Sequence, residues 1–328
     1  MKLLILLHHR FELWNAPAWL APRLRKEFPE LDIVHLDDYA GAESDLRHSE
    51  ILIAWSLRPE QFSAATRLRW VHSPAAAVHQ LIFPEFVASD VVLTNAREVH
   101  GPVVAEHVIA QIFALAKRIP SAVKFQQRHI WGQEQMWDAF PRTREVAGAT
   151  LGLVGIGSIG REVARRAHSL GMHVVAVREH LDKDTPEGVE RVFPLSALEH
   201  VLEISDYVVL ALPLTADTRT LMNAARLKKL RPGACLINVG RGPLIDEGAL
   251  AEALRGRKLG GAAIDVFSKE PLSADSPLWD LEDLLITPHT AALTEKLWER
   301  HYCLIQENLT RFLDGQPLLG IVDKQKGY

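Results

Sequence analysis

The sequence predicts an α/β protein made of two doubly wound domains, each built on a parallel β-sheet. Short runs rich in Val, Ile and Leu alternate with amphipathic helical stretches along almost the whole chain. Strands that are separated by helices usually pair in parallel. The alternation is interrupted once, by a long helical segment and the Trp- and Gln-rich stretch RHIWGQEQMWDAF. At 328 residues the chain is long enough for two cores of ordinary size.

The first alternation supplies five strand-like runs, KLLILL, LDIVHL, EILIAW, RWVHS and VVLTN. Amphipathic stretches such as APAWLAPRLRKEF and RPEQFSAATRL separate them. A long helix is expected over GPVVAEHVIAQIFALAKRI, because Pro102 suits a first helical turn, where no N–H bond is lost. The second alternation runs ATLGLVGIG, HVVAVR, YVVLALP, ACLINVG, GAAIDVF and LLITPH. A last helical pattern, TEKLWERHYCLIQENLTRFLDG, stops at Gly315.

Composition and charge argue against several classes of protein. The net charge of −4 gives no electrostatic case for nucleic acid or an anionic membrane surface. Two cysteines are too few for a disulfide framework, and Cys235 lies in an apolar run where a buried, inert thiol is expected. The apolar run LLILL is too short for a signal peptide, and no stretch approaches the roughly 20 apolar residues of a membrane span. None of the fifteen histidines forms a metal motif. We therefore expect a cytoplasmic protein without a bound metal.

The segment ATLGLVGIGSIGREVARRAHSLGMHVVAV reads as a strand, a glycine turn, a helix and a second strand. This length and order are typical of the βαβ unit that binds dinucleotides. Gly155 permits the tight turn, Gly157 lets the backbone approach a diphosphate, and Gly160 lets helix and strand pack closely. The diphosphate is expected at Ser158 and Ile159, because N–H groups and the dipole at a helix N-terminus favour negative charge. The second alternation therefore predicts an NAD(P) site.

The strand after this turn, HVVAVREH, ends in a cation rather than an acid. In NAD-specific sites an Asp or Glu near this position holds a ribose hydroxyl of the cofactor. Arg178 cannot accept that bond, but its planar fork can bind a 2′-phosphate. We therefore expect NADP(H) to be favoured over NAD(H). Two alternatives stay open: Glu179 could reach the ribose, or Arg178 and Glu179 could form an exposed pair without a cofactor role.

Three further segments carry a family resemblance: INVGRG with Arg241, AAIDVFSKEP with Asp265 and Glu270, and LLITPHTA with His289. This order resembles the D-isomer-specific 2-hydroxyacid dehydrogenases, of the glyoxylate/hydroxypyruvate reductase type. LPLTADTRTLMN, EGALAEALRGRKLGGAAIDVF and PLLGIVDKQKGY resemble the same family. The match spans most of residues 90–328.

The resemblance also implies how the chain is divided. A Rossmann cofactor domain, residues 100–291, is expected to be inserted into a flavodoxin-like substrate domain, residues 1–99 plus 292–328. The chain then crosses between the domains near residues 99 and 291, and the C-terminal helix returns to complete the first domain. A homodimer built around residues 101–140 is implied as well.

Reduction of a 2-keto acid needs a cation for the carboxylate and a proton donor for the carbonyl oxygen. By resemblance Arg241 binds the carboxylate and His289 donates the proton, so both lie against substrate and cofactor. Glu270 orients the imidazole and favours its protonated form, and Asp265 resembles the residue that bonds the nicotinamide carboxamide. Each has a structural alternative: a histidine of the fold, a charged loop, a surface ion pair or a turn acid. The other residues expected along the cofactor are Leu212, Pro213, Val239, Gly240 and Ala291.

One segment departs from the family. The substrate-carboxylate loop usually reads Gly-Ala-Gly-Val-Asp, whereas here Ala75, Ala76 and Ala77 occupy its start and His79 stands at the acid position. Alanine resists positive φ, so this loop is expected to present its N–H groups differently. Trp55, at the end of EILIAW, is either a substrate contact or a core residue.

These residues predict an NAD(P)-dependent oxidoreductase that transfers a hydride between the cofactor and a small 2-keto or D-2-hydroxy acid. Glyoxylate, hydroxypyruvate or a larger relative is the expected substrate, held between the two domains. The alternative is a dinucleotide-gated, non-enzymatic interaction protein. The C-terminal-binding-protein corepressors resemble this family and keep its Arg, Glu and His, so these residues alone do not separate the two.

Overall fold

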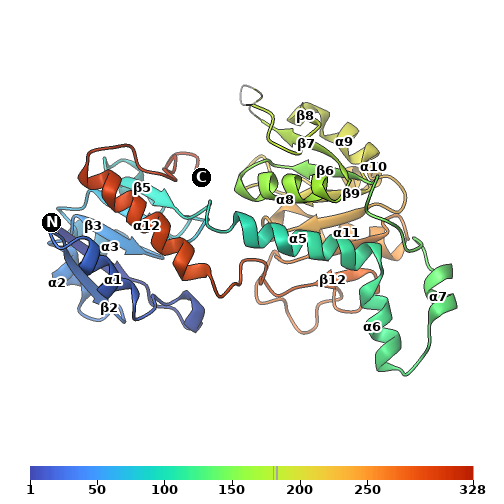
Figure 1. The fold of residues 1–328 in the computed structure, drawn as a ribbon, viewed down its shortest axis with the longest axis horizontal. Helices are drawn as coiled ribbons and strands as arrows, with labels where there is room; N and C mark the ends of the chain where they lie inside the picture. Colours follow the sequence, from blue (N-terminus) through green and yellow to red (C-terminus); the bar gives the residue numbers. More distant parts are fainter. Residues whose placement is uncertain (180, 182–183, 328) are drawn as a thin grey trace. The chain divides into compact units, whose positions relative to one another are not determined.

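The computed structural model describes residues 1–179, 181 and 184–327, and within them the chain forms two compact units (Figure 1). The first unit combines Met1–His100 with the C-terminal segment from Thr294. The second unit is continuous from Gly101 to Leu293. These boundaries lie one and two residues beyond the crossings expected at residues 99 and 291.

The first unit is built on a parallel five-stranded sheet in the order β2-β1-β3-β4-β5, which is the strand order of flavodoxin-like folds. Its strands are β1 (Lys2–Leu6), β2 (Asp32–Leu36), β3 (Ile51–Ala54), β4 (Trp70–Ser73) and β5 (Val92–Asn95). Its helices are η1 (Glu12–Trp14), α1 (Leu20–Glu27), α2 (Ala42–Leu46), α3 (Pro59–Ala64), α4 (Pro84–Val87) and α12 (Leu297–Leu313). All five strand-like runs of the first alternation are strands here.

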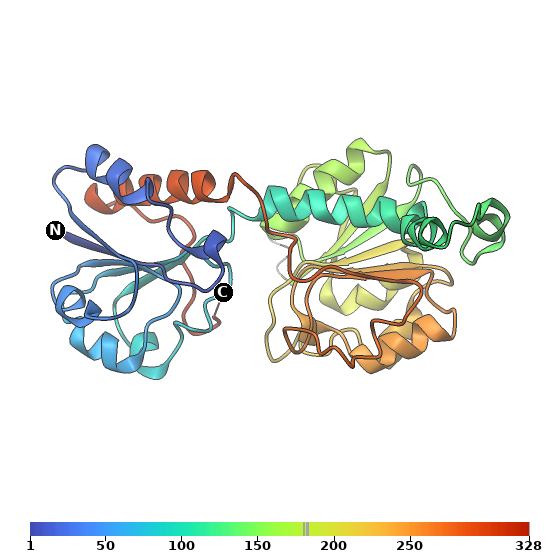
Figure 2. The same cartoon turned by 90° about the horizontal axis from the view of Figure 1, so that it is seen from below.

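Helices cover both faces of this sheet, as the edge-on view in Figure 2 shows. Successive side chains of a strand point to opposite faces. Leu3 and Ile5 of β1 therefore join a core cluster with α1 and α12, while Leu4 and Leu6 join another with α2 and α4. The C-terminal helix α12 thus completes the core of the first unit.

The second unit contains a parallel seven-stranded sheet in the order β12-β11-β10-β9-β6-β7-β8. Its strands are β6 (Thr150–Val154), β7 (His173–Arg178), β8 (Arg191–Pro194), β9 (Tyr207–Leu210), β10 (Cys235–Asn238), β11 (Gly261–Ile264) and β12 (Leu284–Ile286). Its helices are α5 (Gly101–Ala116), α6 (Ile119–Gln127), α7 (Gln133–Asp138), α8 (Ser158–Ser169), η2 (Leu195–Ala197), α9 (Leu198–Ile204), α10 (Ala224–Lys229), η3 (Gly242–Leu244) and α11 (Glu247–Arg255).

The strand order of the second sheet fixes where a ligand fits. The chain starts at β6 in the middle, builds β7 and β8 on one side, and then returns to build β9 to β12 on the other. This is the Rossmann order, and ligands of such sheets bind at the carboxyl ends of the strands where the order reverses. In this unit the reversal lies between β6 and β9. Both parallel α/β folds that the sequence predicted are therefore present.

Two details of the second unit differ from the sequence-based expectation. The long helix expected from Gly101 to Ile119 ends at Ala116, and α6 starts after Arg118, whose φ is +52°. Pro120 explains the break, because proline lacks the N–H for the preceding turn and clashes with it. Strand β8 was not among the expected strands. It has only four residues at the sheet edge and ends in Pro194, which is tolerated there because no further ladder follows.

Cys235 is buried, and burial raises the pKa of its thiol to about 11, which matches the expected inert thiol.

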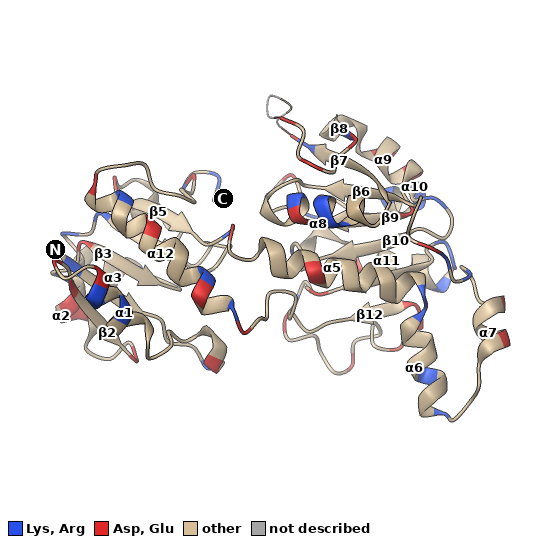
Figure 3. Cartoon of the chain, in the orientation of Figure 1, with Lys and Arg blue, Asp and Glu red and all other residues tan. Residues whose placement is uncertain are grey.

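Charges of both signs are interspersed over each unit (Figure 3). Within the described part of the chain, no helix is long and apolar enough to cross a membrane. The described residues also contain no group of three or more His, Cys, Asp or Glu side chains that could hold a metal ion.

Candidate active site

The three glycines of the turn after β6 differ in what surrounds them. Gly155 has a φ of +97°, and a Cβ there would lie 2.6 Å from the carbonyl oxygen of Ala211. A Cβ on Gly160 would overlap the carbonyl oxygen of Gly155. The Cβ position of Gly157, by contrast, has no atom within 4 Å. Glycine is therefore required by the fold at 155 and 160, whereas at 157 it keeps space open beside the backbone.

That open space lies at the start of α8. The helix begins at Ser158, and its N-cap residue, Gly157, has no side chain with which to bond the first N–H groups. Ser158 and Ile159 form the first turn, the end of a helix that attracts anions. The turn and helix thus fit the diphosphate of a dinucleotide by shape and by charge.

The loops after β9 and β10 lie against each other next to this turn. Leu212 and Pro213 follow β9, while Val239 and Gly240 follow β10 and are buried. A Cβ on Gly240 would lie 2.9 Å from the carbonyl oxygen of Leu212, so the two backbones are in close contact. These four residues therefore border the carboxyl ends of the strands on one side of the point where the strand order reverses.

Arg178 is the last residue of β7, the strand beside β6. Its Nη1 donates a hydrogen bond of 3.0 Å to the carbonyl oxygen of Asp184, and its side chain is half-buried, while Glu179 is exposed. Residues 180, 182 and 183 of the same loop lie outside the described residues. The guanidinium of Arg178 therefore lies at the end of β7, as the sequence predicted, and is hydrogen-bonded to the loop that follows.

Asp265 follows β11 and is 1% exposed. Its Oδ1 accepts bonds from the Thr287 hydroxyl at 2.6 Å and from the N–H groups of Thr290 at 2.9 Å and Ala291 at 3.2 Å. Oδ2 also accepts from the Ala291 N–H, at 3.1 Å. The carboxylate thus has the structural role of a turn acid, which the sequence had left open as an alternative. It fixes the backbone of residues 287–291, the segment that carries His289.

His289 and Glu270 form a hydrogen-bonded pair in the same region. Nδ1 of His289 lies 2.7 Å from Oε2 of Glu270. The other carboxylate oxygen, Oε1, accepts a 2.8 Å bond from the N–H of Phe267, which fixes the carboxylate from behind. The His289 side chain is 53% exposed and that of Glu270 35%, so both are open to a ligand.

The two groups shift each other's protonation. The hydrogen bond to Glu270 raises the pKa of His289, although burial opposes it. Burial alone would raise the pKa of Glu270, but the His289 bond, the Phe267 N–H and the charges of His289 and Arg241 lower it below the usual range. The pair therefore favours a carboxylate beside an imidazolium, with the Nε2 hydrogen of the ring directed away from Glu270.

Arg241 lies between β10 and η3, and its guanidinium is largely buried. Burial lowers the pKa of Arg241, and the charge of Glu270 offsets this only in part. One of its N–H groups donates to the carbonyl oxygen of Gly240 at 2.6 Å. A desolvated cation of this kind attracts an anion strongly, since little water competes. The structure thus brings Arg241, Glu270 and His289 into one charged cluster.

The proposed substrate residues Trp55, Ala75, Ala76 and Ala77 belong to the first unit, at the carboxyl ends of β3 and β4. Trp55 donates its Nε1 hydrogen to the carbonyl oxygen of Trp14 at 3.0 Å and packs against the core cluster of that unit. Trp55 is half-buried, so part of its ring packs in the core and part is accessible.

Hydrogen bonds from two side chains of the first unit hold the alanine loop. Asn95 donates a 2.7 Å bond to the carbonyl oxygen of Ala76, and Ser73 Oγ accepts the N–H of Ala75 at 3.2 Å. Neither Ala75 nor Ala77 takes positive φ. The loop therefore differs in conformation from one that needs glycine at these positions. His79, at the position of the acid, is exposed.

Sequence reasoning missed several polar residues behind the site. Asn238 is fully buried, and its side chain bonds the N–H of Gly240 at 3.0 Å and the carbonyl oxygen of Arg241 at 3.0 Å. His107, Gln111 and Thr287 form a network with Asp265 that is described below. In the sequence, His107 and Gln111 are visible only as two polar residues four positions apart in a largely apolar helix.

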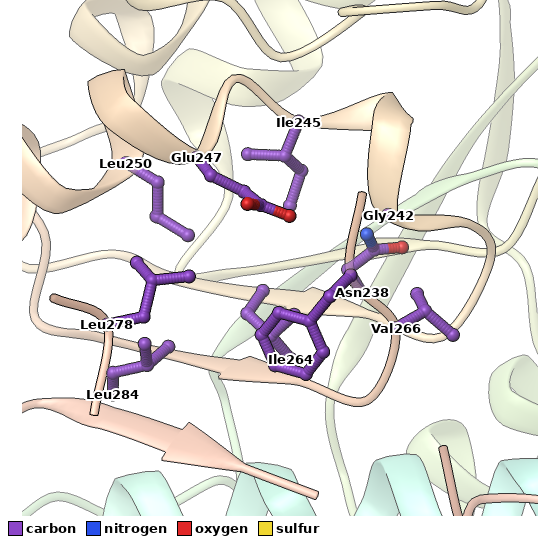
Figure 4. Close-up of a pocket in the computed structure, with 10 residues that line it drawn as sticks. Asn238, Gly242, Ile245, Glu247, Leu250, Ile264, Val266, Leu278 and Leu284 are labelled. Carbon is purple, nitrogen blue, oxygen red and sulfur yellow. The ribbon is translucent and has the colours of Figure 1, made fainter. Parts of the chain in front are cut away.

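A separate small cavity lies beneath η3 (Figure 4), with a volume of about 10 Å³, room for about one water. Its lining is mostly apolar and includes Ile264, Leu278 and Leu284. Neither His289 nor Arg241 lines it, so it belongs to the packing of α11 on the sheet and not to the site.

Comparisons with known proteins agree with this architecture. A family model described as D-isomer specific 2-hydroxyacid dehydrogenase, NAD binding domain, matches residues 109–291. The (S)-sulfolactate dehydrogenase of Chromohalobacter salexigens is 40% identical over 227 residues, which cover 69% of this chain and 71% of that protein. A glyoxylate reductase of Korarchaeum cryptofilum is 33% identical over 271 residues, 81% of this chain and 79% of that protein.

A solved structure is similar over nearly the whole length. The NADPH-dependent glyoxylate/hydroxypyruvate reductase of Sinorhizobium meliloti, in complex with NADP and sulfate, superposes with a TM-score of 0.82 at 29% identity. The similarity covers 100% of this chain and 99% of that one.

The fold, the glycine turn and the charged cluster define an NAD(P)-dependent oxidoreductase. The chain belongs to the D-isomer specific 2-hydroxyacid dehydrogenase family. It is an enzyme that transfers a hydride between the nicotinamide cofactor and a 2-hydroxy or 2-keto acid. The relatives named above are dehydrogenases and reductases, so the alternative of a non-enzymatic interaction protein finds no support among them.

Proposed function

We propose that this enzyme reduces small 2-keto acids such as glyoxylate and hydroxypyruvate, with NADPH preferred over NADH. The observation that carries the catalytic part is the 2.7 Å pair of His289 and Glu270 in one cluster with the partly buried cation Arg241. It supplies a proton donor and an anion-binding group, which are the two requirements of 2-keto acid reduction. The names of the relatives support the substrate class.

In this proposal His289 is the general acid. Its Nδ1 is engaged by Glu270, so the proton available to a carbonyl oxygen is the one on Nε2. Glu270 has two effects: it holds the ring in one orientation and raises the pKa of His289, so that more of the imidazole carries the proton near neutral pH. In the reverse direction the same ring, once neutral, accepts the proton of a 2-hydroxy acid.

Arg241 binds the substrate carboxylate. Only one of its five N–H donors is used in the bond to Gly240, and a guanidinium can place two parallel donors on a carboxylate. Because the group is largely buried, its attraction for an anion is less screened than that of a surface arginine. From the first unit, we propose the loop Ala75–Ala77, through the N–H groups of Ala76 and Ala77, as a further substrate contact and Trp55 as a lateral contact.

The residues that would hold the cofactor follow from the glycine turn and its neighbours. The diphosphate would lie on Gly155, Gly157, Ser158, Ile159 and Gly160, and the rest along Leu212, Pro213, Val239 and Gly240. Asp265, Ala291, Arg241 and His289 would lie around the nicotinamide, with Asp265 bonding its amide. When bound, the cofactor supplies the hydride.

The preference for NADPH rests on Arg178. A cation ends β7, and the similar reductase of Sinorhizobium meliloti is described as NADPH-dependent. The bond to the carbonyl oxygen of Asp184 uses one donor of the guanidinium and holds it at the strand tip. The planar fork of a guanidinium at this position is suited to binding a 2′-phosphate.

We also propose a homodimer. The segment 119–140, which forms α6 and α7, exposes a set of large apolar side chains, and monomeric proteins rarely expose such groups together. These are Ile119, Val123, Ile130, Trp131, Trp137 and Phe140. Light scattering should give twice the mass of one chain, and Trp131→Asp should reduce it toward one. A cytoplasmic location stays a prediction from the sequence.

Turnover with a panel of acids tests the proposed substrate class. Glyoxylate, hydroxypyruvate and larger 2-keto acids are reduced with NADPH or NADH, and (S)-sulfolactate and glycerate are oxidised with NADP or NAD. The proposal expects the highest kcat/KM with a small 2-keto acid and NADPH. A clear preference for sulfolactate, or no turnover with glyoxylate and hydroxypyruvate, would contradict it.

A further inference from the structure

A chain of polar side chains joins α5 to the segment that carries His289. His107 and Gln111 lie one turn apart on α5, and Gln111 is 2% exposed. The amide Nε2 of Gln111 lies 3.0 Å from Nε2 of His107 and 3.4 Å from Oγ1 of Thr287. Nε2 of His107 is itself 3.1 Å from that hydroxyl and 3.7 Å from Oδ1 of Asp265. These polar groups interrupt a helix face that otherwise buries Val104, Val108 and Ile112.

The direction of the bond between Thr287 and Asp265 follows from the number of hydrogens. Thr287 has one hydroxyl hydrogen and gives it to Asp265, because a carboxylate only accepts. Its oxygen therefore accepts, from Nε2 of His107 or from the Gln111 amide according to which ring nitrogen of His107 carries the proton. Burial lowers the pKa of His107 and favours the neutral ring, and the charge of Asp265 offsets the effect only in part.

The end of this network controls the path of the backbone at the site. Asp265 receives the N–H groups of Thr290 and Ala291. The N–H of His289 donates to the backbone carbonyl of Asp265 at 2.9 Å. His289 has a φ of +54°, a conformation that residues other than glycine rarely adopt without support. The orientation of one carboxylate thus decides how residues 287–291 are held.

We propose that His107 is a positioning residue for the nicotinamide end of the cofactor site. Acting through Gln111 and Thr287, it fixes the orientation of the Asp265 carboxylate. Without the polar Nε2 atom of His107, the Gln111 amide and the Thr287 hydroxyl lose a partner inside an apolar environment, and Asp265 loses its fixed geometry. This inference rests on the proposed function, in which Asp265 bonds the nicotinamide amide. Because the His289 ring is also held by Glu270, the larger effect falls on cofactor affinity and the smaller one on proton donation.

Two substitutions separate hydrogen bonding from packing. His107→Leu keeps a side chain of similar size without a polar atom, whereas His107→Gln places an amide, which can donate or accept, at about the reach of the imidazole Nε2. Ile109→Ala is the matched control, since Ile109 is also half-buried on α5 and packs against the core of the same unit. Binding of NADPH and of NADH to each variant is measured by calorimetry, together with kcat at saturating cofactor and the melting temperature.

Cofactor affinity is expected to fall in the Leu variant while kcat stays nearly constant. His107→Leu should raise the Kd of both cofactors about tenfold, equivalent to about 1.4 kcal/mol, with kcat within about threefold of the wild type. His107→Gln should restore most of the affinity, and Ile109→Ala should lower the melting temperature without changing the Kd. Unchanged affinity in His107→Leu, or equal losses in the Leu and Gln variants, would overturn the inference. His289→Ala in the same series keeps the outcomes apart: normal turnover in that variant would instead contradict the proposed function.

Discussion

Nδ1 of His289 lies 2.7 Å from Oε2 of Glu270, and this contact links the charge states of the two residues. The lowered pKa of Glu270 means that its contribution to stability is present above the ordinary carboxyl pKa and is lost as pH falls through the lowered value. The raised pKa of His289 has the opposite sign: its contribution is present below the ordinary imidazole pKa and is lost as pH rises through the raised value. The charged pair therefore contributes its full stability at pH values between the ordinary carboxyl and imidazole pKa values, and that contribution is lost beyond the lowered pKa of Glu270 and the raised pKa of His289.

Glu270→Gln tests this linkage. Glutamine keeps an acceptor for the imidazole but removes the negative charge that raises the pKa of His289. Since keto-acid reduction needs the protonated ring, we expect activity to persist within about tenfold and the alkaline limb of the kcat/KM profile to move to lower pH. Glu247→Gln is the control, because Glu247 accepts a bond from the Ser268 N–H and does not contact His289. An alkaline limb that stays in place would count against the pairing.

Arg241→Ala removes the partly buried cation of the site. We expect kcat/KM for the keto acid to fall about a hundredfold or more, the scale of about 2.8 kcal/mol of charged hydrogen bonding. The Kd of the reduced cofactor should change by less than about threefold. Arg241→Lys should recover only part of the loss, because an ammonium lacks the planar fork. Loss of cofactor binding with an intact keto-acid KM would assign Arg241 to the cofactor alone.

Alanine is expected to act differently at two glycines of the turn, lowering the stability at Gly160 and the cofactor affinity at Gly157. Gly160→Ala should destabilise the protein by about 1–3 kcal/mol, because its Cβ overlaps the carbonyl oxygen of Gly155. Gly157→Ala should leave the melting temperature almost unchanged, since no atom lies within 4 Å of its Cβ and its φ of −77° suits alanine. It should nevertheless weaken cofactor binding by about tenfold or more, because the methyl group occupies the space left for the diphosphate. Equal cofactor affinity in wild type and Gly157→Ala would show that the diphosphate lies elsewhere.

Arg178→Asp should reverse the cofactor preference. The wild type is expected to favour NADPH by about tenfold to a hundredfold, the scale of one charge-assisted contact. Aspartate would accept bonds from the ribose hydroxyls and repel a 2′-phosphate. The ratio of kcat/KM for NADPH and NADH is compared with that of Arg255→Asp, an exposed residue on α11 with the same change of charge. A wild type that already favours NADH, or a ratio that does not move, would remove Arg178 from cofactor recognition.

Much of the fold was readable because local pattern and global structure agree. Every expected strand of both alternations is present, and the strand-turn-helix of residues 150–169 lies where the glycines placed it. The exceptions have local causes. Pro120 divides a helix that apolar spacing alone would continue, and the four-residue β8 is too short to carry a periodic signal.

The sequence predicted the site less well where the site depends on contacts between distant segments. The order of Arg241, Glu270 and His289 was visible, but a sequence does not show that Phe267 orients one carboxylate oxygen and His289 binds the other. Nor does it show that Asp265 holds the loop after β12. His107 is 180 residues from Thr287, so only the folded sheet, which brings α5 to β12, makes them neighbours.

In the proposed mechanism His289 donates the proton to the keto acid, and the kcat of His289→Ala tests this role. The variant is compared with the wild type at saturating NADPH and the best 2-keto acid of the panel, with cofactor Kd and melting temperature as checks on folding. Because the side chain is 53% exposed, the melting temperature should stay close to the wild type, and the cofactor Kd shows how much His289 also contributes to NADPH binding. We expect a kcat at least about a hundredfold lower, the usual scale for a lost general acid. Turnover close to that of the wild type, in a folded variant that binds NADPH normally, would contradict it.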